Sequence, residues 1–423
     1  MKLARLIKFF LIFLPILFLG FLFNEEKEDK SLLLQIGERD YRDKIMEIFP
    51  GQIYSQREGR SVSFLKMIKD MIESRFVYIG ETHNSLPMHD IQLKIIQALY
   101  EQDNGLSIGL EMVPLSTQEI LNKWSLGTLP QDEFIREIEW YVNWNYNFGF
   151  YEKIFEFAKE NKIPLYALNV PREIIKEIRR NGWNSLSEEA KKLVPQPDLA
   201  DEEHRILVRT IFESAEIPHQ MKGQSLEIAF EGLYRAQSAW DEVMAFNAVG
   251  AGKEKKMVVL AGSGHLLYNL GINRRAYKRS GLPFKTVISL AVPRGKESLE
   301  VSRSLADYVW GIPEQERPAF PSIGLSFKKF DDLDNLVVER KPIDGVAKGA
   351  DFEKGDVVLS VDGKVFDDIN QLRMYLARFN WDEEAKFRLV RKAQELEVTL
   401  RFKMPEEKRD KEKENKAHES VSH

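Results

Sequence analysis

Two segments of this chain place a histidine just after a short apolar run. Residues 76–83 read FVYIGETH and residues 257–265 read MVVLAGSGH, so both end in Gly-x-x-His. In an open α/β sheet, ligands bind outside the carboxyl ends of the strands, which is where both histidines are expected. Glu81 and Glu111 also follow apolar runs, and two imidazoles with two carboxylates suit zinc, iron or manganese. We therefore predict a metal site formed by His83, His265, Glu81 and Glu111. The alternative is that the histidines only tie loops together by hydrogen bonds.

Other polar side chains follow the same predicted sheet edge. Asn169 ends a third apolar run, and Arg172 stands in the first turn of the next predicted helix, where it could bind a carboxylate. His89 follows His83 by six residues and could reach back from its helix. The aromatic segment 140–151 could form the walls of a site for a flat apolar ligand. The alternatives are a surface ion pair for Arg172, a solvated helical face for His89 and an ordinary core for the aromatic residues.

The elements that must position these residues alternate between strand and helix. Short apolar runs and longer helical periodicities predict an α/β fold with a mostly parallel sheet, flanking helices and a helical insertion at about 187–250. The insertion contains two long predicted helices, 201–215 and 223–249, while residues 31–70 resemble an amphipathic lead-in. The predicted strands are 76–80, 106–112, 164–170, 257–261, 285–292 and a short final one at 307–311.

The remainder of the chain has a different pattern. Residues 311–321 are rich in proline and charge and are predicted to be a linker that ends an α/β domain of residues 45–310. Residues 322–404 carry short strands around one helix, which is typical of a small β+α domain. Residues 405–423 are almost all charged and are predicted to be disordered.

Composition and the amino terminus limit the classes of function. The chain has 423 residues, a formal net charge of −5 and no cysteine, which excludes disulfides, thiolate metal sites and a lipid-bearing cysteine. Its basic residues are not gathered with aromatic ones in a folded stretch, so no nucleic-acid partner is predicted. Basic residues precede the apolar stretch 7–23, so residues 1–29 are predicted to be a signal peptide or a membrane anchor. We expect an exported, periplasmic or extracytoplasmic protein, anchored to the membrane by this helix.

Taken together, these motifs resemble a known family. Segments 79–83, 110–112, 140–151, 167–172 and 261–265 are similar in order and placement to the ChaN-like haem-binding uptake proteins of the Tiki, TraB and erythromycin-esterase-like superfamily. The resemblance implies a periplasmic protein that binds haem and is associated with iron uptake. In that family a tyrosine holds the haem iron, and the candidates here that lie near the motifs are Tyr146, Tyr151 and Tyr268. ChaN proteins are typically lipoproteins, so this cysteine-free chain departs from the family there.

The last folded part resembles a PDZ domain of the bacterial HtrA-protease type. Residues 351–363 look like its core signature, and Ile323, Gly324 and Leu325 look like its carboxylate-binding loop. A glycine loop offers backbone N–H groups to a peptide carboxylate, and the helix that carries Leu372 would line a groove for an added strand. The predicted partner is the C-terminal peptide of another protein.

Three functions remain open at this point. The leading one is a haem- or iron-binding protein whose PDZ-like domain recruits a partner. The alternative is a metal-dependent hydrolase in which Glu81 or Glu111 acts as general base and the paired histidines hold the metal, as the Tiki branch implies. The third is a scaffold in which only the PDZ-like groove is active.

Overall fold

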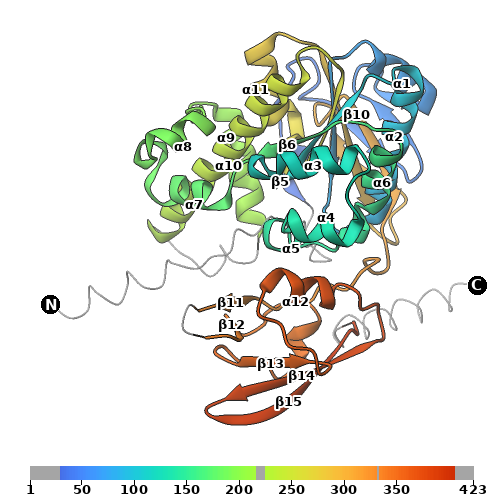
Figure 1. Cartoon of the computed structure of the whole chain (residues 1–423). Helices are drawn as coiled ribbons and strands as arrows, with labels where there is room; N and C mark the ends of the chain where they lie inside the picture. The colour runs from blue at the N-terminus through green and yellow to red at the C-terminus, as the bar shows by residue number, and fades with distance from the viewer. Residues whose placement is uncertain (1–28, 216–223, 331–332, 405–423) are drawn as a thin grey trace, which may run out of the picture. The chain divides into compact units, whose positions relative to one another are not determined.

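A mainly parallel, eight-stranded sheet is the largest element of the computed structural model, drawn in Figure 1. Its strand order is β3-β2-β10-β8-β4-β7-β5-β6, and the pairs from β10 to β5 are parallel. Strands β4, β5 and β7 are buried at every residue, which explains why they read as continuous apolar runs in the sequence. The strands of this sheet are β2 (Ile53–Ser55), β3 (Arg60–Val62), β4 (Phe76–Glu81), β5 (Ser107–Pro114), β6 (Leu165–Asn169), β7 (Met257–Gly262), β8 (Phe284–Val292) and β10 (Tyr308–Pro313). A separate antiparallel pair joins β1 (Ile45–Ile48) to β9 (Leu299–Ser302).

The structure describes residues 29–215, 224–330 and 333–404. The predicted signal or anchor and the predicted disordered tail fall outside these ranges, apart from residue 29. Within them, no helix is both long and apolar enough to cross a membrane. The helices are α1 (Phe64–Ile72), α2 (Leu86–Gln102), α3 (Gln118–Ser125), α4 (Gln131–Glu137), α5 (Trp140–Asn143), α6 (Glu152–Glu160), α7 (Arg172–Asn181), α8 (Glu188–Leu193), α9 (Glu202–Ser214), α10 (Gln224–Gly252), α11 (Ile272–Ser280) and α12 (Ile369–Leu376).

The C-terminal sheet is wholly antiparallel. It has five strands in the order β11-β12-β13-β14-β15, and β11 forms one edge. Its core includes Phe352, Phe387 and two leucines of α12. The strands are β11 (Phe327–Lys329), β12 (Leu336–Val338), β13 (Val357–Val361), β14 (Glu384–Arg391) and β15 (Gln394–Arg401). The predicted fold class, an α/β part followed by a small β+α domain, is confirmed.

The chain divides into two units that are not simply consecutive in sequence. The first contains residues up to His83, Lys94–Glu111 and Leu168–Glu314. The second contains Asn84–Leu93, Met112–Ala167 and everything from Gln315 onward, so the aromatic segment and the C-terminal sheet share one unit.

The structure differs from the sequence prediction at both ends of the α/β part. The predicted lead-in, residues 31–70, contains β1, β2 and β3 as well as α1. Strand β10 continues to Pro313, so the first residues of the predicted linker belong to the sheet. Both differences arise because these strands are short and are stabilised by pairing with distant strands, as β2 is with β10.

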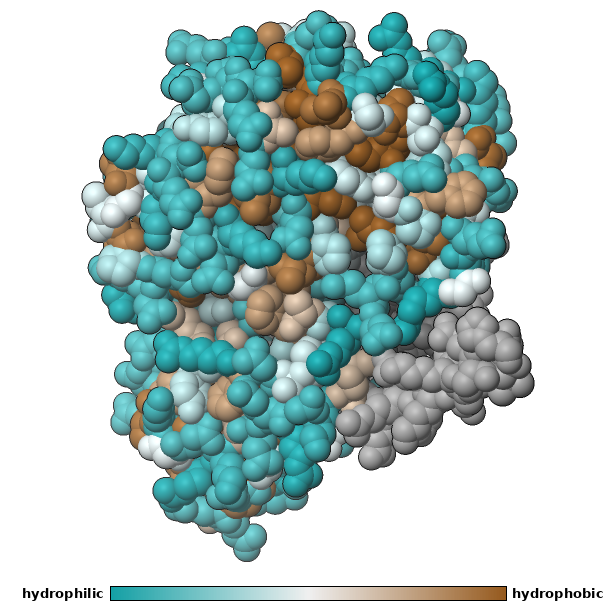
Figure 2. All heavy atoms as spheres, turned by 90° about the vertical axis from the view of Figure 1, so that its right-hand side faces the viewer, coloured by the Kyte–Doolittle hydropathy of each residue, from teal (hydrophilic) through white to brown (hydrophobic). Residues whose placement is uncertain are grey.

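Hydrophobic residues also remain on the surface. On the face shown in Figure 2 they lie in groups between hydrophilic residues, most clearly in the upper half of the view. Leu65 of α1, for example, is 78% exposed and Leu126 is 65% exposed. Exposed apolar residues of this kind are normal on folded proteins, so we assign no ligand to them.

Candidate functional site

The end of β4 presents a buried carboxylate–imidazole pair. Nδ1 of His83 lies 2.9 Å from Oε1 of Glu81, and both residues are buried. The imidazole of His83 lies against Gly262 at the end of β7. If Gly262 had a Cβ atom, that atom would lie only 2.8 Å from Cε1 of His83. Glycine at this position therefore leaves room for the His83 ring.

A second pair lies beside the first, on β5 and just after β7. The backbone N–H of Gly262 donates to Oε2 of Glu111 at 2.6 Å, and Oε1 of Glu111 lies 3.3 Å from Nε2 of His265. Asn169 is also at this edge, because its side-chain amide donates to the carbonyl oxygen of Glu111 at 3.3 Å. Four of the predicted strand-end residues, together with Asn169, thus come together in the first unit. Arg172 is the first residue of α7 and is partly exposed, so its role as a carboxylate-binding residue stays a prediction.

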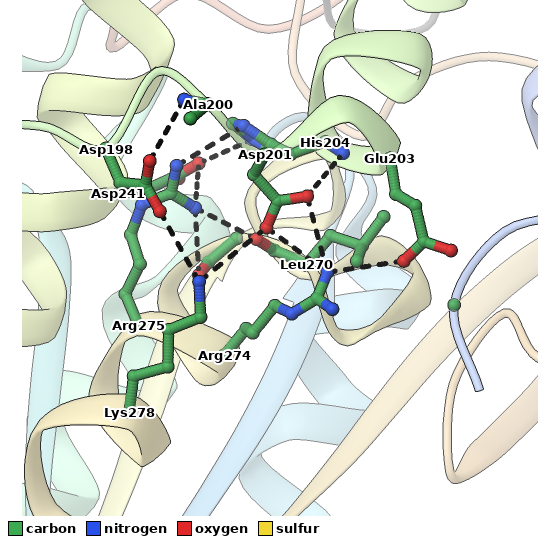
Figure 3. Close-up of polar contacts among 12 residues, drawn as sticks. Asp198, Ala200, Asp201, Glu203, His204, Asp241, Leu270, Arg274, Arg275 and Lys278 are labelled. Carbon is green, nitrogen blue, oxygen red and sulfur yellow. Dashed lines mark hydrogen bonds and ion pairs between the residues drawn. The ribbon is translucent and has the colours of Figure 1, made fainter. Parts of the chain in front are cut away.

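The other nitrogen of His265 contacts the helical insertion. Nδ1 lies 2.5 Å from Oδ1 of Asp241 on α10, and the amide of Gln237, one turn earlier, lies 2.8 Å from the same nitrogen. Oδ2 of Asp241 lies 3.0 Å from Nε2 of His204 on α9 and 3.7 Å from Arg275 on α11. Figure 3 shows the part of this group formed by Asp241, His204 and Arg275, with the neighbouring ion pairs of Arg274 and Lys278. The insertion is therefore connected to the sheet edge by a chain of buried charges.

The sequence analysis did not identify Asp241, Gln237 or His204. One signal was available, because Gln237 and Asp241 are four residues apart in the predicted helix 223–249 and so share one face. Their contact with His265 depends on how α10 packs, and residue spacing does not specify that.

Two carboxylates determine the charge of His265. Burial disfavours the charged imidazolium, but Glu111 and Asp241 outweigh this effect and raise the pKa of His265 to about 10. Burial likewise opposes ionisation of Asp241, yet His265, His204 and Arg275 together hold its pKa well below the usual range. Because both ring nitrogens of His265 face carboxylates, its charged imidazolium form is favoured at neutral pH.

This charge should make stability depend on alkaline pH. The pKa of His265 is raised from about 6.5, so its stabilising contribution is complete below about pH 6.5 and is lost as the pH rises to about 10. We expect urea unfolding of the wild type to show decreasing stability from pH 6.5 to 10, and His265→Gln to lose part of that slope. Equal slopes in the two proteins would show that His265 is not charged in the folded state.

The predicted four-ligand metal centre is not supported. Among the described residues, no group of three or more His, Asp or Glu side chains is arranged to hold a metal ion. Instead, the four side chains form two hydrogen-bonding or ionic pairs, in which each histidine faces its own carboxylate.

The C-terminal sheet presents a glycine loop at its edge strand. Gly324 has φ of +76°, and a side-chain carbon there would lie 2.0 Å from the carbonyl oxygen of Asp344, so only glycine fits. Ile323 is partly buried, Leu325 is buried, and β11 follows this loop along the edge of its sheet. An edge strand after such a loop can pair with an added peptide strand.

The predicted role of Leu372 in peptide binding is not supported. Leu372 is fully buried in the domain core and offers no surface to a peptide.

Comparison with known proteins supports both parts of this description. Residues 67–276 match the family model described as haem-binding uptake, Tiki superfamily, ChaN, and residues 321–402 match the PDZ domain model. Residues 67–276 are a domain of the ChaN family. The PDZ domain follows it, as predicted from residues 322–404.

Individual relatives are distant. "Protein RETICULATA-RELATED 5, chloroplastic" of Arabidopsis thaliana is 28% identical over 136 residues, and the match covers 30% of this chain but only 18% of that protein. A structure of ChaN from Campylobacter jejuni with cofacially bound haem is 19% identical, covers 62% of this chain and 96% of that one, and has a TM-score of 0.49. An HtrA-type protease, AlgW, with a decapeptide is 17% identical, covers 27% of this chain and 40% of that one, and has a TM-score of 0.20.

The three tyrosines predicted as ligands of the ChaN-family domain have different environments. Tyr268 is buried, and its hydroxyl donates to the carbonyl oxygen of Ser31 at 2.7 Å and accepts from the N–H of Leu34 at 2.9 Å. Burial also raises the pKa of Tyr268 well above its usual value. Tyr268 therefore ties the start of the described chain to the domain, and its buried hydroxyl is engaged by backbone groups of that segment.

The other two tyrosines belong to the aromatic segment of the second unit. Tyr151 is buried, and its hydroxyl accepts from the indole N–H of Trp144 at 3.0 Å. His89 is buried beside it, with ring centroids 4.2 Å apart, so His89 is part of this aromatic core. Tyr146 alone among the three is partly exposed, and its ring lies 5.6 Å from that of Trp144. Tyr146 is thus the candidate of the three with access to a ligand.

Proposed function

We propose that this chain is an extracytoplasmic haem-binding protein associated with iron uptake, and that its PDZ domain binds the C-terminal peptide of a partner. The observation that carries the proposal is the match of residues 67–276 to the haem-binding ChaN family. The basic and apolar pattern of the first 23 residues supports export, and the edge strand β11 behind the glycine loop supports peptide binding.

The residues of the aromatic segment fit haem. A haem-binding surface needs a flat apolar wall and an oxygen or nitrogen donor for the iron. Tyr146 would supply the phenolic oxygen, and its ring lies against Trp144, which is buried and would hold Tyr146 in position. Bound haem would supply an iron centre that the protein can carry or deliver.

Haemin titration of the purified full chain tests this function. We expect a saturable shift of the Soret band at a fixed stoichiometry. A shift no larger than that of an unrelated protein of similar size would reject haem binding. Fractionation of cells that express the chain, with a periplasmic marker enzyme as reference, separately tests the proposed location.

Tyr146→Phe is expected to raise the haemin Kd at least about 10-fold, since removing even an outer-shell partner costs that much at many metal sites. Tyr277→Phe is the matched control, because it removes the hydroxyl of a tyrosine that is 51% exposed on α11. The Soret position should change in the first variant only. An unchanged Kd in Tyr146→Phe would show that another residue holds the iron.

A second candidate function is hydrolysis, and the Glu81–His83 pair is the observation that favours it. A histidine whose Nδ1 is held by a buried carboxylate can act as general base through Nε2. Turnover of ester or peptide substrates that disappears in His83→Ala would support this function. If the wild type turns over none of these substrates but binds haemin, the haem-binding function stands alone.

A further inference from the structure

Helix α5 of the second unit lacks a cap of its own. It has only four residues, Trp140–Asn143, and begins after Glu139, which has φ of +48° and makes no side-chain capping bond. The first N–H groups of a helix have no partner within the helix and need an outside acceptor. Here the N–H of Tyr141 donates to Oδ1 of Asn370 at 3.1 Å, and Asn370 belongs to helix α12 of the PDZ domain.

Both ends of the Asn370 amide are used. Its Nδ2 donates to the carbonyl oxygen of Arg136 near the end of α4 at 3.3 Å, while its Oδ1 accepts from Tyr141. A flipped amide would place two donors against each other, so the orientation follows from the partners. Asn370 is 3% exposed, and it therefore bridges the end of α4 and the start of α5 from a buried position.

Further contacts join the same two segments. Arg373, about one turn after Asn370, donates to the carbonyl oxygen of Tyr141. In the opposite direction, the side-chain amide of Asn147 donates to the carbonyl oxygen of Ala377, the C-cap residue of α12, at 2.9 Å. The two segments thus satisfy each other's free helix ends, and α12 lies next to α5 in Figure 1.

Aromatic packing fixes the far end of the segment. Phe150 meets Phe320 edge-on at 4.9 Å, and a side-chain carbon at Gly149 would lie 2.5 Å from the Phe320 ring. Between these contacts, the indole N–H of Trp140 donates to the carbonyl oxygen of Tyr146 at 2.7 Å. The position of Tyr146 therefore depends on α12 of the PDZ domain at one end of the segment and on Phe320, just before that domain, at the other.

We propose that Asn370 and Arg373 of the PDZ domain are positioning residues for the aromatic segment that carries Tyr146. The PDZ domain then completes the ligand-binding segment of its own chain, in addition to binding peptides. The expected effect on haem affinity rests on the proposed function, whereas the ordering of residues 139–151 by the PDZ domain does not.

Amide hydrogen exchange of the full chain tests the ordering directly. In Asn370→Ala, residues 139–151 should exchange about 5- to 10-fold faster, as the loss of one buried hydrogen bond implies, while β13 in the PDZ core keeps its protection. Gln371→Ala is the matched control, because Gln371 is the next residue of α12 and is exposed. Asn370→Asp keeps the acceptor for Tyr141 and should restore part of the protection. Arg373→Gln repeats the test if Asn370→Ala does not fold.

Haemin titration of the same variants gives the functional readout. The haemin Kd should rise in Asn370→Ala, where the segment that carries Tyr146 loses its position, and stay unchanged in Gln371→Ala. Unchanged exchange in residues 139–151 of a folded Asn370→Ala variant would overturn the proposal. Faster exchange with an unchanged haemin Kd would overturn its functional part. If the wild type binds no haemin, the proposed function fails, and the exchange comparison alone decides the positioning role.

Discussion

Asp241→Asn is expected to lower the free energy of unfolding by about 3–5 kcal/mol, the usual cost of removing one partner from a buried ion pair. Asp241 is fully buried and its carboxylate lies against His265, His204 and Arg275. The neutral amide would leave the positive charge of His265 with only Glu111 as its partner. Urea unfolding at pH 7, followed by circular dichroism, measures the loss.

Glu227→Gln provides the control for Asp241→Asn. Glu227 pairs with Arg209 at 2.8 Å between α10 and α9, but its side chain is 55% exposed. Ion pairs exposed to solvent contribute little to stability, so this variant should unfold almost like the wild type. Similar losses in both variants would contradict the special role of the buried carboxylate.

Lys256→Met is expected to cost about 1.5–3 kcal/mol, the value typical of hydrogen bonds to a charged group. The buried ammonium of Lys256 donates to three backbone carbonyls at the carboxyl end of α1, those of Met71 and Ile72 in its last turn and of Ser74 just after it. Lys256 directly precedes β7, and its ammonium therefore caps the carboxyl end of α1. Methionine keeps the apolar stem but offers no donor to these carbonyls.

The adjacent residue gives a matched control for Lys256→Met. Lys255 is exposed, so Lys255→Met should change the urea midpoint by little. A loss in Lys255→Met as large as that in Lys256→Met would mean that net charge, rather than the cap, determines the effect.

Much of the candidate site could be predicted because parallel strands leave a strong local signal. The runs 76–81 and 257–262 are apolar at nearly every position and are buried at every residue, and the first polar groups after them lie at the sheet edge. Strands β1 to β3 lack this signal. They are three or four residues long, and β1 alternates exposed and buried residues, which is too short a pattern to distinguish from a lead-in segment.

The partners of the predicted residues could not be read from spacing. His265 and Asp241 are separated by 24 positions and meet only because α10 packs against the end of β7. The metal prediction counted possible donors, whereas in the structure each imidazole lies against a carboxylate. Likewise, Tyr146, Tyr151 and Tyr268 are the same residue type near the same motifs, and only their burial and hydroxyl partners separate them.

Helix α12 contacts both β11, the strand expected to receive a peptide, and α5, the helix before Tyr146. Thermodynamic linkage then imposes a symmetry on the two binding events. If a peptide displaces α12 and changes the affinity for haem by some factor, bound haem must change the affinity for that peptide by the same factor. The affinity of the PDZ domain for its partner would in that case depend on whether the chain has haem bound.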